Sequence, residues 1–259
     1  MEIILKPSKN QHITINEELI NRLVEYAEIS NKDVVLEIGG GTGNLTEKLI
    51  EKAKNLTVVE IDKELVEILK QKFSKKENIK IVEGNILDIE IPGFNKNVSS
   101  LPYNICEPLL WKLIRLNFDL LVFVIPKGFY EILNAKENEE KYSKVSLMVK
   151  YFFGLEFKEV VKAEDFYPKP KVESVVVVMK PKKLEENKVN FIIKELFLQY
   201  DKKLKNALRE AFVKYNKNTK KEAKEIIEKL NLNEKILSEK VSHLSLESFK
   251  ELIRKLKSL

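Results

Sequence analysis

Residues 33–43 read Asp-Val-Val-Leu-Glu-Ile-Gly-Gly-Gly-Thr-Gly, and this stretch decides the fold. Asp33–Ile38 is a short apolar run typical of a buried strand, and four of the eight glycines of the chain follow it within five residues. Such a cluster lets the backbone turn sharply and approach a ligand closely. We therefore expect a strand, then a ligand-binding turn, then a helix at Leu45–Ala53.

The alternation of strand and helix continues along the chain, which indicates a parallel sheet with helices on both faces. Further on, two strands follow one another without a long helix between them, and we expect them to form an antiparallel pair that closes the sheet. The predicted strands are Leu56–Ile61, Ile79–Glu83, Asn97–Ser99, Asp119–Ile125, Gly154–Val161 and Ser174–Lys180. The other predicted helices are Asn16–Ile29 (with Asn16 as N-cap), Lys63–Lys75, Glu107–Leu116 and Tyr142–Tyr151.

The pattern changes at Pro181–Lys188, a charged stretch that resembles a linker. Beyond it only helical periodicity remains, and we expect helices at Phe191–Gln199, Leu204–Tyr215, Lys220–Leu230 and Leu246–Leu256. The expected organisation is an α/β domain of residues 1–180 and a small all-helical domain of residues 181–259.

Positive charge is concentrated in the second of these domains. Residues 181–259 contain 20 Lys and Arg against 12 Asp and Glu, whereas the whole chain has a net charge of +6. A basic end on a near-neutral body fits the binding of nucleic acid. A solvated, lysine-rich helical surface explains the composition equally well.

Composition also narrows the setting of the protein. Cys106 is the only cysteine, and the two histidines, His12 and His243, are distant in sequence, so no cluster of metal ligands is expected. The longest apolar stretches, such as Leu120–Ile125, are too short to cross a bilayer, and no signal peptide is recognisable. We expect a cytoplasmic protein without a metal or a membrane anchor.

Glu60 lies 21 residues after Gly39, about where a nucleotide-binding fold places a carboxylate for ribose hydroxyls. NAD is one candidate cofactor, but its loop usually reads G-x-G-x-x-G and faces a pyrophosphate. The pattern here is E-x-G-x-G-x-G, which resembles the loop of class I methyltransferases that bind S-adenosylmethionine (SAM). The resemblance implies SAM as the cofactor, held by Glu37, Gly39, Gly41, Gly43, Glu60 and Ile61.

Ser100-Leu101-Pro102-Tyr103 resembles the (Asn/Asp/Ser)-x-Pro-(Tyr/Phe) motif of enzymes that methylate exocyclic amines of bases. Such an amine is a poor nucleophile because its lone pair is delocalised into the ring. A side-chain oxygen and the carbonyl beside a proline can accept both amine hydrogens, which favours a pyramidal nitrogen aimed at the methyl group. Tyr103 would stack on the base. These four residues are the predicted catalytic motif.

Phe166-Tyr167-Pro168-Lys169-Pro170-Lys171-Val172-Glu173-Ser174 resembles the F-x-P-x-P-K-V-x-S signature of the ribosomal RNA adenine dimethyltransferase family. The resemblance implies a SAM-binding Rossmann-like domain followed by a helical domain, and dimethylation of adenines near the 3′ end of small-subunit ribosomal RNA. It implies that Phe166 clamps a flipped base. It also adds Gln11, Asn85 and Ser100 to the expected cofactor contacts.

The chain departs from the family pattern at several positions. Ser100 stands where the family usually has Asn, and serine there also resembles the motif of cytosine N4-methyltransferases. Asn85 replaces a common Asp, and Asn10-Gln11 replaces Gly-Gln. The basic segment of the helical domain appears as 199–208, with two arginines replaced, one of them by an acid, so phosphate contacts there should be weaker.

Our first hypothesis is therefore an RNA methyltransferase that acts on adenine N6 in ribosomal RNA, alone or in a partly assembled subunit, with cytosine N4 as the close alternative. An RNA-binding assembly factor that has lost catalysis is a second hypothesis, motivated by Asn10, Asn85 and Ser100. An NAD-dependent oxidoreductase is disfavoured, because no convincing proton-transfer group lies near the loop. We expect a monomer.

Overall fold

The computed structural model describes residues 12–183, 185, 187–216 and 219–259. Their contacts divide them into a sheet unit, residues 12–134 and 153–181, and a helical unit, residues 135–152 and 182–259. The expected boundary after residue 180 lies next to the third point at which the chain passes between the units, after Pro181. Residues 135–152, which we expected in the first domain, belong to the helical unit.

A seven-stranded sheet in the order β4-β3-β2-β5-β6-β9-β7 forms the centre of the sheet unit. The five strands from β4 to β6 are parallel, whereas β9 is antiparallel to both β6 and β7, so the expected antiparallel pair is confirmed. The strands are β2 (Val34–Ile38), β3 (Asn55–Glu60), β4 (Ile79–Glu83), β5 (Lys96–Ser100), β6 (Leu120–Pro126), β7 (Phe153–Val161) and β9 (Ser174–Pro181).

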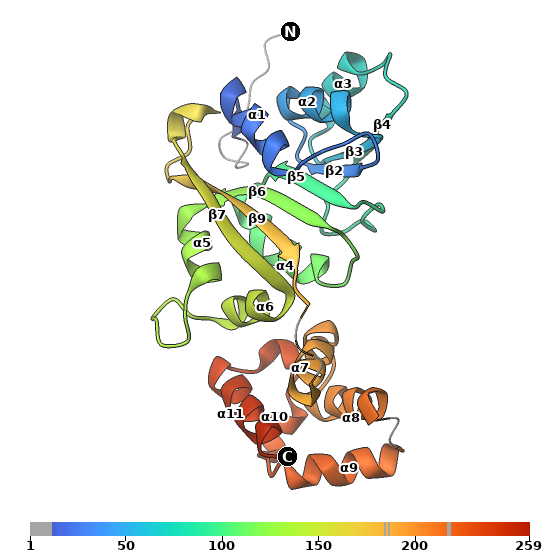
Figure 1. Cartoon of the computed structure of the whole chain (residues 1–259), viewed down its shortest axis with the longest axis vertical. Helices are drawn as coiled ribbons and strands as arrows, with labels where there is room; N and C mark the ends of the chain where they lie inside the picture. Colours follow the sequence, from blue (N-terminus) through green and yellow to red (C-terminus); the bar gives the residue numbers. More distant parts are fainter. Residues whose placement is uncertain (1–11, 184, 186, 217–218) are drawn as a thin grey trace. The chain divides into compact units, whose positions relative to one another are not determined.

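Helices cover both faces of the sheet, with α1, α2 and α3 on one side and α4 and α5 on the other (Figure 1). The expected Rossmann-like α/β architecture is thus confirmed. Asn16 caps α1 as expected, since its side chain accepts the Leu19 N–H at 3.2 Å. The helices are α1 (Glu17–Tyr26), α2 (Asn44–Lys52), α3 (Lys63–Lys72), α4 (Cys106–Leu113) and α5 (Lys127–Asn134).

The core follows from the two-residue period of the strands. In β6, Val122 and Val124 belong to the cluster beneath α1 and α2, while Leu121 and Phe123 point to the opposite face, and all four are buried. Burial of each such side chain stabilises the fold by about 1.5–3 kcal/mol. A strand buried on both faces therefore reads as an unbroken apolar run, which is how the sequence revealed it.

Sequence reasoning did not predict one α-helix and two strands of the sheet unit. The helix α5 is short and carries Gly128 in its first turn, which weakens its helical signal. The strands β1 (Ile13–Thr14) and β8 (Phe166–Tyr167) have two residues each and pair only with one another. Strands this short have no periodicity to detect.

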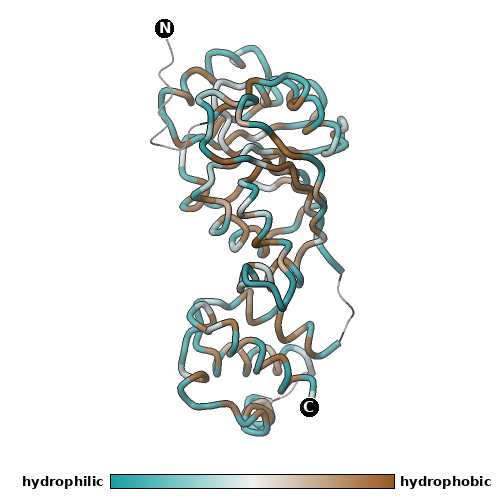
Figure 2. The backbone as a smooth tube through the Cα atoms, turned by 90° about the vertical axis from the view of Figure 1, so that its left-hand side faces the viewer, coloured by the Kyte–Doolittle hydropathy of each residue, from teal (hydrophilic) through white to brown (hydrophobic). Residues whose placement is uncertain are grey.

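The helical unit is built from amphipathic helices, whose alternation between hydrophobic and hydrophilic residues is visible in Figure 2. Phe197 lies at its centre, stacked on Phe249 with ring centroids 5.2 Å apart and in edge contact with Phe152 at 6.0 Å. This contact explains why the segment that ends at Phe152 belongs with the helical unit. Its helices are α6 (Lys144–Phe152), α7 (Lys188–Leu198), α8 (Leu204–Asn216), α9 (Lys220–Lys229), α10 (Glu234–Ser238) and α11 (Leu246–Lys257).

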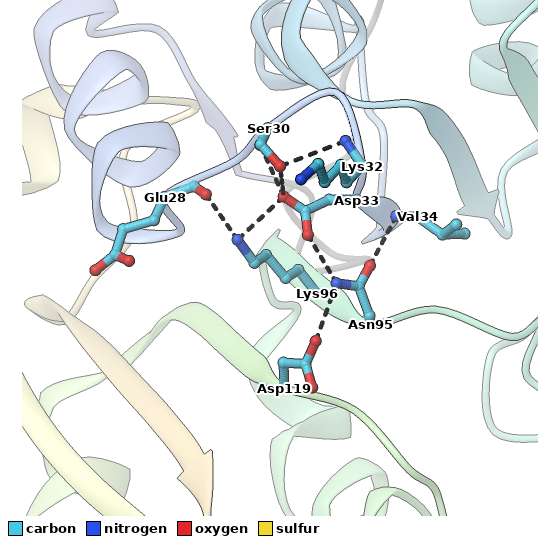
Figure 3. A network of polar contacts seen from close by, with 8 residues as sticks. All are labelled: Glu28, Ser30, Lys32, Asp33, Val34, Asn95, Lys96 and Asp119. Atoms are coloured by element: carbon cyan, nitrogen blue, oxygen red, sulfur yellow. Dashed lines mark hydrogen bonds and ion pairs between the residues drawn. The ribbon is translucent and has the colours of Figure 1, made fainter.

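A polar network fixes the amino ends of the parallel strands (Figure 3). The Asp33 carboxylate accepts hydrogen bonds from Asn95 Nδ2 at 2.7 Å and from Lys96 Nζ at 3.1 Å. Asn95 also donates to Asp119 and accepts the Val34 N–H. Burial opposes the charge of Asp33, but these donors outweigh it and lower the pKa of Asp33 to about 2. The network joins β2, β5 and β6 at the edge of the sheet away from the cavity described below.

Candidate active site

The strand order reverses at β2, which lies between β3 and β5. In an open parallel sheet, the loops that leave neighbouring strands at such a point run in opposite directions and open a crevice at the carboxyl ends. A cavity of about 390 Å³ lies there, within the size range of small-molecule sites. Ile38, Val59 and Ser100, at or next to the carboxyl ends of three adjacent strands, all line it.

The glycine turn forms one wall of this cavity. Gly39 and Gly41 have φ values of +78° and +54°, which side chains rarely adopt. A Cβ atom added at Gly39 would lie 3.9 Å from the Ser100 carbonyl oxygen, so the missing side chain keeps the space between the turn and β5 open. Gly43 is different: it caps α2, and a Cβ there would come within 2.8 Å of the Phe73 ring. Gly39 and Gly41 line the cavity, whereas Gly43 is required by internal packing.

Glu60 ends β3 and lines the opposite wall. One of its carboxylate oxygens accepts the Gly41 N–H at 3.1 Å, and the other accepts the N–H groups of Ile61 and Asp62 at 2.9 Å each. The carboxylate thereby fixes the distance between the glycine turn and the end of β3. Ile61 beside it is 63% exposed, an apolar side chain available to a flat ring.

Glu37 does not reach the cavity. It is buried beneath the glycine turn, where Thr46 Oγ1 donates to its carboxylate at 2.6 Å. Burial raises the pKa of Glu37 to about 8, and the nearby Glu60 carboxylate adds to this effect. The group is therefore protonated at neutral pH and supports the turn from below.

Asn85 lines the cavity, but its side chain is bonded within its own loop. Its Oδ1 accepts the Leu87 N–H at 3.1 Å, and its Nδ2 donates to Asp88 at 2.8 Å. The same loop is held from the outside by Lys112 of α4, whose ammonium donates to the carbonyls of Ile86, Leu87 and Ile89. Sequence reasoning missed Lys112, because nothing in the sequence links it to the loop after β4.

The motif of residues 100–103 leaves β5 at the edge of the cavity. The Leu101 N–H donates to the Val124 carbonyl at 3.1 Å, which ties the motif to β6. Pro102 is followed by a short 3₁₀ helix, Tyr103–Ile105, in which the Ile105 N–H donates to the Pro102 carbonyl at 3.1 Å. Ser100, Leu101, Pro102 and Tyr103 all line the cavity, as does Asn104, which sequence reasoning missed.

The β1–β8 pairing brings Phe166 to the same cavity. Thr14 pairs with Phe166, and His12 Nδ1 donates to the Pro168 carbonyl at 2.7 Å. Phe166 is buried and lines the cavity together with His12 and Ile13. Gln11, which we expected to contact the cofactor, lies outside the described residues.

The structure thus gathers most of the predicted site around one space. The cavity is lined by the predicted residues Gly39, Gly41, Glu60, Ile61, Asn85, Ser100, Leu101, Pro102, Tyr103 and Phe166. Glu37 and Gly43 lie outside its lining. Residues that sequence reasoning did not assign are His12, Ile13, Ile38, Val59, Asp62, Leu65, Gly84, Ile86, Asn104 and Ile105. Several of these follow strand ends, so the carboxyl-end rule was the signal that could have found them.

The described part of the chain holds neither a cluster of metal-ligating side chains nor a helix that could span a membrane. No group of three or more His, Cys, Asp or Glu side chains there could hold a metal ion. Among the same residues, no helix has the length and apolar character that crossing a membrane requires.

The fold and the cavity suit a nucleoside-like cofactor with a charged tail: apolar walls for a base, a carboxylate for ribose hydroxyls and a glycine turn that leaves room. Together they define a class I SAM-dependent methyltransferase. A family model described as ribosomal RNA adenine dimethylase matches residues 4–251. The chain belongs to this ribosomal RNA adenine dimethylase family.

Individual relatives agree with this assignment. The chain is 40% identical over 203 residues to a probable ribosomal RNA small subunit methyltransferase A of Methanococcoides burtonii, covering 76% of this chain and 75% of that protein. It is 36% identical over 197 residues to the protein of the same name from Pyrococcus abyssi, covering 76% and 73%.

Two crystal structures resemble the whole fold. A dimethyladenosine transferase from Plasmodium falciparum has a TM-score of 0.65 and 26% identity, covering 94% of this chain and 96% of that one. The 23S rRNA methyltransferase ErmE has a TM-score of 0.64 and 22% identity, covering 95% and 99%, and supports the fold. In both cases the similarity extends over the sheet unit and the helical unit.

Proposed function

We propose that this enzyme transfers methyl groups from SAM to the N6 amine of adenine in small-subunit ribosomal RNA. The single observation that carries the proposal is the common cavity, where the glycine turn and the Ser100–Tyr103 motif face one space. The names of the relatives support the RNA, and the family description supports adenine as the base.

The walls of the cavity suggest how SAM would be held. Glu60 would accept hydrogen bonds from the ribose hydroxyls, and Ile61 would cover a face of the adenine ring. Gly39 and Gly41 would let the methionine portion lie against the backbone. When bound, SAM supplies an electrophilic methyl group. The residues of this chain would only have to position the acceptor amine and accept its hydrogens.

Two oxygens are available for the amine. The Pro102 carbonyl is engaged by the Ile105 N–H, so we assign the acceptor beside the proline to the Leu101 carbonyl. Ser100 Oγ would be the second acceptor. Tyr103 would stack on the base, a contact that typically contributes about 1–3 kcal/mol. Phe166 would close the other side of the base.

Ser100 also keeps cytosine N4 as a second candidate acceptor, because serine has a shorter reach than the asparagine usual in the family. Mass spectrometry of nucleosides from small-subunit RNA, with and without the gene, separates the two. Loss of dimethyladenosine in the deletion strain is the expected result. Loss of a methylated cytidine instead would move the assignment to cytosine, and no change in either nucleoside would refute a ribosomal target.

We further propose that the helical unit holds the RNA by its phosphates. Two lysines of the expected segment, Lys202 and Lys205, are paired with Glu210 at 2.5 Å and with Glu234 at 3.6 Å. A different surface of the unit is better suited. A cleft of about 540 Å³ is lined by four lysines, Lys150, Lys182, Lys188 and Lys257, and by no acidic side chain among the described residues.

None of these four lysines is paired with a carboxylate in the described part of the chain. Unpaired lysines that share a cleft leave a positive potential that a phosphate backbone neutralises with release of counterions. We therefore assign the RNA contact of the helical unit to this lysine cleft. We also propose that the enzyme acts as a monomer in the cytoplasm, which light scattering and cell fractionation would test.

A further inference from the structure

The antiparallel strand β9 brings its first residue to the active edge of the sheet. Ser174 pairs with Pro126 at the end of β6 and with Val161 at the end of β7. Because β9 runs against its neighbours, it begins where they end. The same edge holds Ser100, which pairs with Val124 of β6. Thus the last residue of the Phe166–Ser174 signature lies at the edge from which the catalytic motif emerges.

Ser174 contacts the motif directly. Its Oγ lies 2.5 Å from the hydroxyl oxygen of Tyr103, a hydrogen bond in which either group can donate. Ser174 has no exposed surface, and Tyr103 is half-buried with its ring on the cavity. The bond therefore forms away from bulk water, where a hydrogen bond restrains its partners more strongly.

This bond removes the main freedom that the Tyr103 ring would otherwise keep. The backbone of Tyr103 is fixed by Pro102 and by the 3₁₀ turn, but its ring could still swing about the side-chain bonds. The hydrogen bond at the hydroxyl group fixes the other end of the ring. Two fixed ends hold the long axis of the ring in one direction and so keep the ring at one place on the cavity, as a stacking surface requires.

We propose that Ser174 is a positioning residue: its hydroxyl holds the Tyr103 ring in the position from which it stacks on the target base. The inference rests on the proposed function, in which Tyr103 contacts that base. It also gives the final serine of the signature a role in the reaction, where a purely structural strand start would need none.

A double-mutant cycle tests this role. Ser174→Ala removes the anchor, and Tyr103→Phe removes the hydroxyl while keeping the stacking ring. Each should lower kcat for methylation of unmethylated small subunits by about ten- to a hundredfold, the loss typical of slight misplacement of a reacting group. The SAM dissociation constant should stay within about twofold. If the two hydroxyls act as one unit, the double variant should be no slower than the slower single variant.

Ser146→Ala is the matched control, because it removes another buried hydroxyl, on α6 of the helical unit. It should match Ser174→Ala in thermal stability within a few degrees and keep full activity. The positioning role would be overturned if Ser174→Ala kept the kcat of the wild type, or if the losses of the two single variants multiplied in the double variant. Tyr103→Ala separates the two levels: if it remains active, the proposed base pocket itself is misplaced, whereas its inactivity beside an active Ser174→Ala rejects only the inference about Ser174.

Discussion

At the scale of single residues, the site combines groups that touch the cavity with groups that support it. Glu60 and Tyr103 line the cavity, while Glu37 and Ser174 lie behind them and hold the backbone turn and the ring in place. Sequence motifs do not distinguish the two kinds of residue, because a motif gives the residue type at a position and not the direction of its side chain. The supporting residues should therefore differ from the lining residues in what their loss changes.

Glu37 should make stability depend on pH. Its pKa is raised from an ordinary value of 4.5 to about 8, so the folded chain keeps a proton that the unfolded chain loses. The stabilisation that Glu37 contributes is fully present below about pH 4.5. It falls by up to about 1.4 kcal/mol per pH unit as the pH rises towards 8, and it does not change further above that pH. Glu37→Gln should remove this slope. Thermal unfolding from pH 5 to 8 measures it, with the exposed Glu51→Gln as control; parallel curves for wild type and Glu37→Gln would contradict the buried, protonated state.

Tyr103 and Glu60 should separate base binding from cofactor binding. Tyr103→Ala should reduce methyl transfer by about a hundredfold, because stacking and orientation are both lost. Its affinity for SAM should stay nearly intact. Glu60→Ala should instead weaken SAM binding by at least tenfold, as measured by calorimetry. Equal loss of SAM binding in both variants would mean that the two halves of the cavity have been assigned wrongly.

At the scale of elements, loops and strand ends are held by groups from distant parts of the chain. Lys112 of α4 donates to three carbonyls of the loop after β4, and burial lowers the pKa of its ammonium. At the other edge of the sheet, the polar network around Asp33 ties the amino ends of three strands (Figure 3). The Lys112 contacts shape the cavity, and the Asp33 network aligns the strands whose carboxyl ends line it.

Lys112→Met should weaken SAM binding on the order of tenfold, because three loop carbonyls lose a charged donor and the wall formed by Gly84–Ile86 loosens. Calorimetry measures the affinity. Lys48→Met, which removes a lysine paired on the surface with Glu17, should bind SAM as wild type does. An unchanged affinity in Lys112→Met would show that the loop holds its shape by itself.

Asp33→Asn should lower the free energy of unfolding by about 2 kcal/mol at neutral pH. This value follows from the pKa of Asp33, which the network lowers from 3.8 to about 2. For a lowered carboxyl pKa the contribution is present above about pH 4 and is lost as pH falls towards 2. The difference in unfolding free energy between wild type and variant should therefore shrink over this window. Urea unfolding at pH 7, 4 and 2.5 tests it; a constant difference would exclude the ionised network as the cause.

At the scale of the whole molecule, the lysines of the helical unit differ in whether a carboxylate neutralises their charge. Some lysines of the helical unit are neutralised by partners, such as Lys214 with Glu195 at 2.7 Å, while those of the lysine cleft are not paired in the described residues. Total charge, which is all that composition gives, does not distinguish them. Only the unpaired group can exchange counterions for phosphates without breaking an existing ion pair.

Replacement of Lys150, Lys182 and Lys188 by Gln should weaken RNA binding and reduce its salt dependence. The log–log slope should fall by up to about 0.9 for each phosphate that the variant no longer neutralises. The matched control replaces the paired lysines Lys202, Lys205 and Lys214 by Gln, with the same change in charge within the same unit. It should change the slope much less. Filter binding of small-subunit RNA at several salt concentrations measures both; equal slopes for the two triple variants would reject the cleft as the RNA contact.

The sequence by itself determined the α/β fold, the glycine turn, the Ser100–Tyr103 motif and the family. These are local signals: residue periodicity, a cluster of glycines and short motifs depend on neighbours in the chain. The tertiary structure alone decided that Gly39 and Gly41 face the cavity while Glu37 and Gly43 do not. It also placed Ser174 against Tyr103 and residues 135–152 in the helical unit. The physical reason is that the direction of a side chain is set by what packs against it, and those partners come from strands and helices far away in the sequence.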